Sequence, residues 1–114
     1  MPIAMTAKKI DLLKNFLSEK ESSVERFFIK ECQRRGVFQF KNTPPPKGVP
    51  DRTAIKDGIV LYVELKCETG RLSENQKQFH EHIRAHGGNI EVVYSKNDVT
   101  RALDKYWPQQ KSKR

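Results

Sequence analysis

Three residues whose side chains suit hydrolytic chemistry lie on either side of one short turn. Asp51 precedes the pair Asp57-Gly58, and Glu64 and Lys66 follow it. Asp-Gly is preferred in two-residue hairpin turns because both positions tolerate positive φ. Since Asp51 and Glu64 are equally far along the chain from this pair, we expect them directly opposite each other in the hairpin. Opposed carboxylates about 5 Å apart repel and destabilise a sheet, so the sequence predicts a cation between them.

The second strand of the hairpin brings the lysine to the same place. Every second residue from Ile59 to Cys67 is apolar and is expected in the core, so Glu64 and Lys66 share the other face with Asp51. Oxygen ligands without nearby cysteine or paired histidine suit Mg²⁺ or Mn²⁺. Such a cation activates water and polarises a phosphoryl group, and Lys66 would orient that water or offset charge at phosphorus. The alternative to a metal site is that Asp51 is a turn residue after Pro50 and that Glu64 and Lys66 lie on a solvated strand face.

Three motifs in this order resemble the VRR-NUC branch of the PD-(D/E)XK nucleases. They are Gly48-Val49-Pro50-Asp51-Arg52, Val63-Glu64-Leu65-Lys66, and Leu72-Ser73 with Gln76. The resemblance spans about residues 21–103. It implies an α/β fold with a restriction-endonuclease-like core, in which helices flank a mixed β-sheet, and a Mg²⁺- or Mn²⁺-dependent phosphodiesterase without an organic cofactor. On this basis we expect Asp51, Glu64 and the Leu65 main-chain carbonyl as metal ligands, with Lys66 and Gln76 around the attacking water.

The resemblance also implies a further carboxylate from the helix before the sheet, and Glu21 and Glu25 are both candidates. We prefer Glu25 as the catalytic residue and direct or water-mediated metal ligand, because residues 24–36 resemble the opening helix of archaeal Holliday junction resolvases. By helical angle, Glu21 lies nearer the middle of the apolar stripe. Each also fits a capping box, with Ser18 and Ser22 respectively, which would give it a purely structural role.

Other polar residues have two interpretations each. Lys41, Lys47 and Arg52 are predicted to contact nucleic-acid phosphates, although an exposed basic residue is also ordinary in such a basic chain. Gln76 is expected to face the sheet from its helix. With Ser73 it also fits a capping box, in which its side chain would bind the backbone at the helix start.

Three histidines and two large aromatic residues are expected to have structural roles. His82 and His86 have the spacing of a helical zinc pair, but no third ligand is evident, so they and His80 are predicted to be surface residues. Tyr62 is expected to pack rather than to stack on a base. Trp107 is predicted in the core or in a dimer interface.

Composition limits the class of protein. The 114 residues suit one domain, and 22 Lys and Arg against 14 Asp and Glu give a net charge of +8, which favours a polyanionic partner such as nucleic acid. No stretch has the roughly 18 apolar residues of a membrane span, and no signal peptide is evident, so we expect a cytoplasmic protein of a bacterial or phage-infected cell. Cys32 and Cys67 are expected to be buried free thiols.

Apolar periodicity and Gly and Pro positions predict the elements. We expect helices over residues 6–17, 22–36 and 73–86 and a last one ending near Trp107, and strands over 37–40, 51–56, 59–67 and 90–94. The order is roughly ααβββαβα. Residues 1–20 would form an N-terminal helical extension, 21–107 the nuclease domain, and 108–114 a disordered basic tail, while the proline-rich segment 42–50 would be a loop.

These expectations favour a structure-specific DNA endonuclease, a homodimer similar to Holliday junction resolvases whose substrate is branched DNA. One alternative is a nuclease acting on flaps or ordinary duplex, from a phage, replication or restriction system. Another is a non-catalytic basic module that binds DNA through its phosphates, which would bind in a salt-dependent way and need no metal.

Overall fold

The computed structural model describes residues 21–42, 47–67 and 69–109. In chain order its elements are α2 (Glu21–Arg34), β1 (Phe38–Lys41), β2 (Arg52–Lys56), β3 (Ile59–Leu65), α3 (Glu74–Ala85), β4 (Asn89–Val93) and α4 (Lys96–Tyr106). This confirms the expected order from the second helix onward. The helix expected at 6–17 and most of the expected basic tail lie outside the described residues. Among the described helices, none has the length and apolar character needed to cross a membrane.

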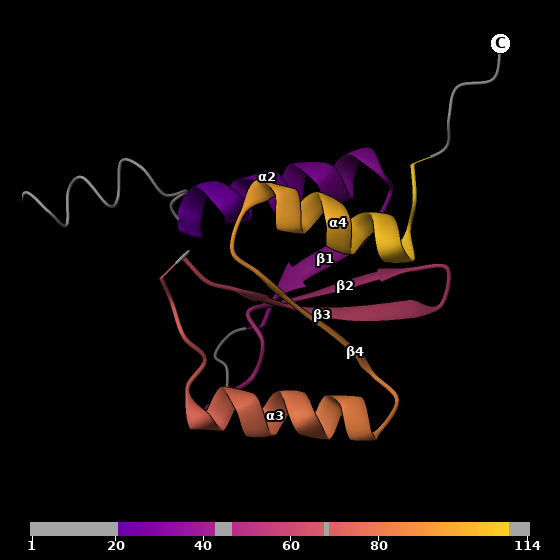
Figure 1. The fold of residues 1–114 in the computed structure, drawn as a ribbon. Helices are drawn as coiled ribbons and strands as arrows, with labels where there is room; N and C mark the ends of the chain where they lie inside the picture. Colours follow the sequence, from indigo (N-terminus) through magenta and orange to yellow (C-terminus); the bar gives the residue numbers. More distant parts are fainter. Residues whose placement is uncertain (1–20, 43–46, 68, 110–114) are drawn as a thin grey trace, which may run out of the picture.

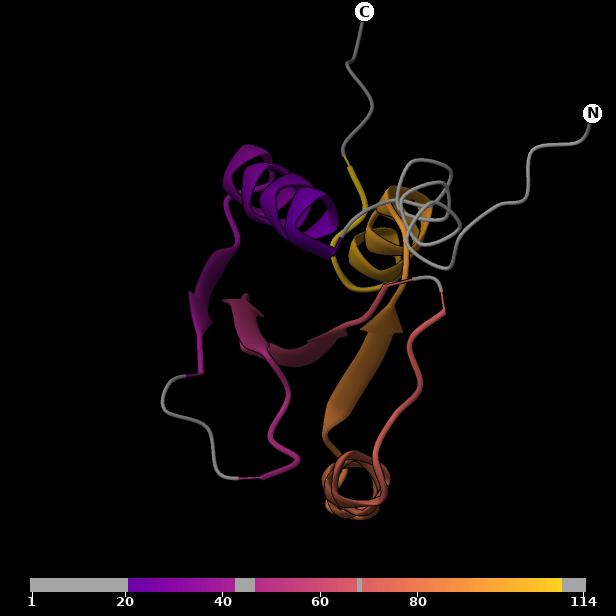
Figure 2. The same ribbon diagram turned by 90° about the vertical axis from the view of Figure 1, so that its left-hand side faces the viewer.

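The four strands form one mixed sheet in the order β1-β2-β3-β4. β1, β2 and β3 are antiparallel neighbours, whereas β3 and β4 run parallel, so the chain must cross over between them. α3 makes this crossover on one face of the sheet, and α2 and α4 lie together on the other (Figures 1 and 2). The α/β layering and mixed sheet expected from the sequence are therefore confirmed.

The hairpin between β2 and β3 has the predicted turn and register. Asp57 and Gly58 have φ of 54° and 79°, as a turn with two left-handed residues requires. Arg52 faces Val63 across the two strands, and both residues are equally far from the turn. The register that underlies the predicted metal site is confirmed.

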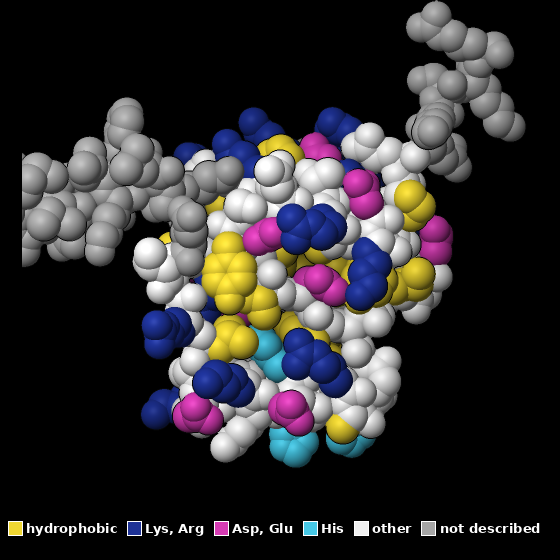
Figure 3. Space-filling view, in the orientation of Figure 1, with side chains coloured by type: hydrophobic (Ala, Val, Ile, Leu, Met, Phe, Trp, Pro, Cys, Tyr) yellow, Lys and Arg dark blue, Asp and Glu magenta, His cyan; other side chains and the backbone are white. Residues whose placement is uncertain are grey.

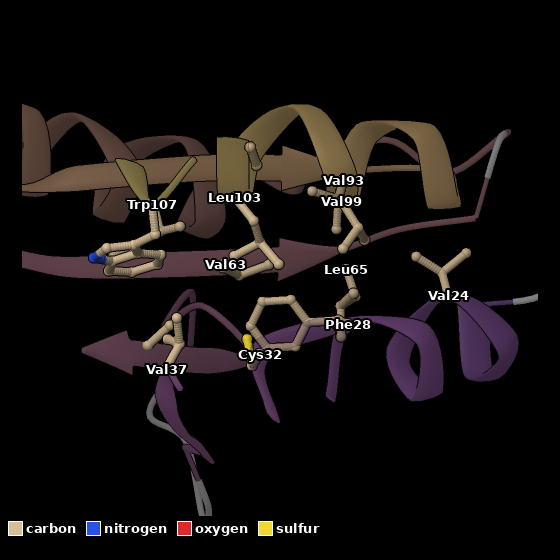
Figure 4. Packing of buried hydrophobic residues seen from close by; sticks show 13 residues of the cluster. Val24, Phe28, Cys32, Val37, Val63, Leu65, Val93, Val99, Leu103 and Trp107 are labelled. Atoms are coloured by element: carbon tan, nitrogen blue, oxygen red, sulfur yellow. The ribbon is translucent and has the colours of Figure 1, made fainter. Parts of the chain in front are cut away.

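The main core lies between the sheet and the helix pair α2 and α4. Its members include Phe28, Cys32, Leu61, Val63, Leu65, Val93, Leu103 and Trp107 (Figure 4). Burial of such side chains stabilises the fold by roughly 1.5–3 kcal/mol each. Trp107 is a core residue, one of the two expected positions. Both cysteines are free thiols; Cys32 is buried as expected, but Cys67 is only half-buried because β3 ends before it.

A buried arginine fixes the C-terminal end of α2 to the rest of the molecule. Arg35 donates to Asp104 Oδ1 at 2.7 Å and to the Trp107 carbonyl at 3.2 Å. Its own carbonyl accepts from Lys56 Nζ at 2.7 Å. These bonds link α2, α4 and the turn end of β2, which also fixes the direction in which the N-terminus of α2 points.

The other face of the sheet is only partly covered. Tyr62 of β3 is half-buried and lines a hollow together with Phe79 and Ile83 of α3, and its packing role stays a prediction. On the edge strand β1, the side chains of Phe38 and Phe40 remain 64% and 41% exposed. α3 therefore covers the β4 side of this face and leaves the β1 side open (Figure 2).

Candidate active site

Asp51 and Glu64 meet at the open end of the hairpin, as their register requires. Asp51 Oδ2 accepts the main-chain N–H of Leu65 at 2.7 Å, and the Glu64 side chain, only 2% exposed, is hydrogen-bonded to the Asp51 carboxyl. Burial, this hydrogen bond and the charge of Asp51 raise the pKa of Glu64 to about 8. Without a cation the pair therefore shares a proton at neutral pH.

Asn42 holds the strand segment that carries Asp51. Its side-chain amide donates to the Pro50 carbonyl at 2.9 Å, and its main-chain N–H donates to the Asp51 carbonyl at 2.9 Å. Its side-chain oxygen accepts from the Thr53 hydroxyl at 3.0 Å. These bonds bridge the two ends of the loop that precedes β2. The sequence pattern predicted Asn42 only as the start of this loop and gave no signal of its positioning role.

Gly48 docks the same loop on the N-terminus of α3. Its φ is +90°, which strongly favours glycine, and an added Cβ would collide with the main-chain carbonyl of Asn75. The loop backbone thus approaches α3 more closely than any residue with a side chain would allow. Because Asp51 follows three residues later, this contact helps to set the position of the carboxylate.

Gln76 caps the N-terminus of α3 together with Ser73. Its Oε1 accepts the main-chain N–H of Ser73 at 2.8 Å, and the Ser73 hydroxyl accepts the Gln76 N–H at 3.1 Å. This is the capping box that the sequence left open as an alternative. In this structure the Gln76 side chain satisfies backbone donors, and its expected contact with an attacking water stays a prediction.

Lys66 follows β3 and lies beside the acidic residues. Its main-chain N–H donates to the Val93 carbonyl at 3.0 Å, and its side-chain stem lies close to Gly70. Its positive charge acts to lower the pKa of both Glu64 and Glu21. The structure therefore brings Lys66 to the predicted site.

The two candidate carboxylates of α2 face different partners. Partial burial, and then the negative charge of Asp51, raises the pKa of Glu21, which also senses Lys66. Glu25 instead accepts from Arg52 Nε at 3.0 Å. Thus Glu21 interacts electrostatically with Asp51 and Glu64, whereas the contact seen for the preferred Glu25 is its ion pair with Arg52. A helical turn separates the two residues, and the tilt of α2 on the sheet decides which one approaches the site.

The three residues predicted to contact phosphates have different environments. Lys41 and Lys47 are exposed. Arg52 is engaged on two sides, because its Nη1 also donates to Gln39 Oε1 at 2.6 Å. Lysine and arginine side chains are spread over the face shown in Figure 3 and interspersed with acidic ones, so charge alone does not mark a path for DNA on this face.

His80 is buried, which corrects its predicted place on the surface. Its Nε2 lies 3.2 Å from Glu64 Oε1, and the two side chains are 1% and 2% exposed. His82 and His86 are exposed, as predicted. The sequence did contain a signal for His80: it lies four residues after Gln76 on the helix face expected to meet the sheet.

Comparison with known proteins agrees with this geometry. The sequence model of the VRR-NUC domain matches residues 37–97, just over half of the chain. The chain belongs to the VRR-NUC family. A solved structure titled VRR-NUC domain is 26% identical, with a TM-score of 0.69 over 76% of this chain and 97% of that one. No significant match was found among curated proteins. The VRR-NUC domain is a nuclease of the PD-(D/E)XK type, with DNA as its substrate.

VRR-NUC nucleases of this fold generally use divalent metals, and the donor atoms here suit a hard cation. The described residues do not gather three His, Cys, Asp or Glu side chains around one point. They provide the Asp51 and Glu64 carboxylates in contact, with the Leu65 carbonyl close by in the chain. Mg²⁺ commonly binds through one or two carboxylates and keeps several waters. A cation would also replace the shared proton, so this VRR-NUC domain fits such a group.

Proposed function

We propose that this VRR-NUC domain is a Mg²⁺- or Mn²⁺-dependent endonuclease that cuts branched DNA, a Holliday junction or a related structure, as a homodimer. The observation that carries the proposal is the burial of the Glu64 carboxyl at the open end of the hairpin, where the register places it beside Asp51. Two opposed carboxylates destabilise an ordinary sheet because they repel. A divalent cation bound between them would remove that repulsion.

Each residue at the site has a role in phosphodiester hydrolysis. Asp51 and Glu64 hold the cation, with Glu21 in reach as a water-mediated ligand. When bound, the cation would lower the pKa of a coordinated water and polarise the phosphoryl group. Lys66 places a positive charge where negative charge develops at phosphorus. Exposed Lys41 contacts the DNA backbone.

Dimerisation has a geometric reason. One chain of this size carries one such site, whereas symmetric incision of two strands needs two. A twofold axis supplies the second site in a fixed relation to the first. A four-way junction has a matching symmetry, which makes it the expected substrate.

A cleavage assay with Mn²⁺ tests the proposal. Wild type and Lys66→Ala are compared on a labelled four-way junction, a flap and a linear duplex. The control is Lys105→Ala, which instead removes a lysine of α4 that is paired with Glu91 of β4. We expect paired nicks in the junction with wild type and the control, and a loss of roughly 10²-fold or more with Lys66→Ala.

The other outcomes distinguish the remaining functions. Cutting of the flap or the duplex in preference to the junction would keep the nuclease and discard the preference for branched DNA. Tight DNA binding that depends on salt but not on metal, without cleavage of any substrate, would indicate a non-catalytic DNA-binding module.

A further inference from the structure

We propose that His80 is a positioning residue that orients the Glu64 carboxylate for cation binding. This inference rests on the metal site of the proposed function. His80 comes from α3, a different element from the strands that carry Asp51 and Glu64. It therefore connects the metal site to the helix that covers this face of the sheet.

The contact is enclosed and specific. His80 Nε2 is 3.2 Å from Glu64 Oε1, and both side chains are almost entirely buried. A buried carboxylate oxygen needs a donor because water cannot reach it. The imidazole of His80 is hydrogen-bonded to this oxygen, and it supplies the donor when its proton is on Nε2.

The chemistry of the pair determines which nitrogen carries the proton. A cation-bound carboxylate only accepts hydrogen bonds, so His80 must donate through Nε2–H. Nδ1 then carries a lone pair and no proton. Nδ1 has no hydrogen-bond partner in the described part of the chain, which suits a bare nitrogen better than a buried N–H group, whose unmet donor would cost more.

This hydrogen bond limits how Glu64 can bind a cation. With Oε1 held by the imidazole, the carboxylate cannot rotate freely, and Oε2 is the oxygen left for a metal. Mg²⁺ demands nearly ideal octahedral geometry, so a fixed carboxylate orientation favours its binding. Partners that orient metal ligands in this way typically change metal affinity by about 10–100-fold.

Calorimetric titration with Mn²⁺ alone, without DNA, tests the inference on four forms of the chain. His80→Leu removes the donor, and His80→Gln keeps one, because a glutamine amide nitrogen reaches approximately where Nε2 lies. The exposed His82→Leu on the same helix is the control. We expect His80→Leu to bind Mn²⁺ about 10–100-fold more weakly than wild type, His80→Gln to recover most of the affinity, and His82→Leu to match wild type.

Melting in EDTA separates positioning from folding. We expect His80→Gln to melt near wild type, and any form used for titration must be folded. If His80→Leu does not fold, His80→Met takes its place, because its flexible side chain fills the space without a strong donor. A folded variant that lacks the donor and binds Mn²⁺ as tightly as wild type would overturn the inference and leave the metal site intact. Failure of wild type to bind Mn²⁺ would overturn both proposals.

Discussion

At the scale of single residues, the site holds two carboxyl groups, Asp51 and Glu64, so close together that burial and repulsion disfavour ionisation of both. Glu64 is buried beside Asp51, and their hydrogen bond requires a proton when no cation is present. A proton and a divalent cation therefore compete for the same pair of carboxylates. Because bound metal requires deprotonated ligands, the competition has a measurable consequence for stability.

The unfolding free energy in EDTA should fall as pH rises. The pKa of Glu64 is about 8 in the folded chain against an ordinary 4.5, so the folded state holds the extra proton between these values. The contribution of Glu64 to the unfolding free energy is fully present below pH 4.5. Between pH 4.5 and about pH 8 it falls by at most about 1.4 kcal/mol per pH unit. Melting temperatures in EDTA from pH 5 to 9 measure the effect.

Glu64→Gln supplies the matched control for this pH series. Glutamine imitates the protonated acid, so the variant should lack the group's pH dependence and melt above wild type at pH 9 in EDTA. Mn²⁺ should stabilise wild type most at high pH, where fewer protons compete. A wild-type curve parallel to that of the variant would contradict the assigned proton.

The residue scale also shows where sequence information ends. The Asp51 and Glu64 pairing was predictable because a turn type fixes the register of its hairpin locally. The burial of His80 depends on how α3 lies on the sheet, and the pairing of Arg52 with Glu25 depends on the tilt of α2. Neither is a property of local sequence.

At the scale of elements, α2 selects which carboxylate enters the site. The bonds of Arg35 fix the C-terminal end of this helix, and the fixed helix presents Glu21 to Asp51 and Lys66. The sequence predicted the helix itself and both candidate residues. The resemblance favoured Glu25, whereas helical periodicity placed Glu21 nearer the middle of the apolar stripe, and neither gives the placement of the helix over the sheet; Glu25 as a metal ligand stays a prediction.

Replacing each α2 carboxylate by its amide distinguishes their roles. We expect Glu21→Gln to weaken Mn²⁺ binding and slow cleavage several-fold, because it removes a negative charge near the cation. Glu25→Gln should leave Mn²⁺ affinity nearly unchanged and cost at most about 1 kcal/mol of stability, the value of a partly exposed ion pair. Titration calorimetry and melting measure the two effects, and the reverse ranking in Mn²⁺ affinity would reinstate Glu25 as the ligand.

The contact between Gly48 and α3 is a second feature at this scale. We expect Gly48→Ala to lower the melting temperature and to weaken Mn²⁺ binding, because the new Cβ pushes the loop away from Asn75 and moves Asp51. The control is Gly87→Ala, at φ +78° with no atom near the added Cβ. It should cost only the roughly 1–2 kcal/mol of a left-handed residue and keep the metal affinity. Equal losses of affinity in both variants would show that the loop contact does not position the site.

At the scale of the whole molecule, residues 21–42, 47–67 and 69–109 carry one candidate active site, and the full chain has a net charge of +8. The charge provides attraction to DNA without selecting a structure. In the proposed function, selection of a branched substrate comes from the arrangement of two sites in a dimer. The sequence predicted the class of nuclease through its motifs, whereas a twofold partner depends on surface shape that no motif encodes.

Mixed dimers test whether two sites act together on one junction. The mass of wild type measured by analytical ultracentrifugation should be twice the 13.3 kDa of one chain. When wild type is mixed with an excess of Lys66→Ala, most active dimers contain one working site, so single nicks should replace paired nicks on a four-way junction. Lys105→Ala in the same excess should leave paired nicking unchanged. Paired nicks that persist with the Lys66→Ala excess, or a mass of one chain at assay concentration, would mean that each chain cuts independently, and the preference for junctions would lose its geometric basis.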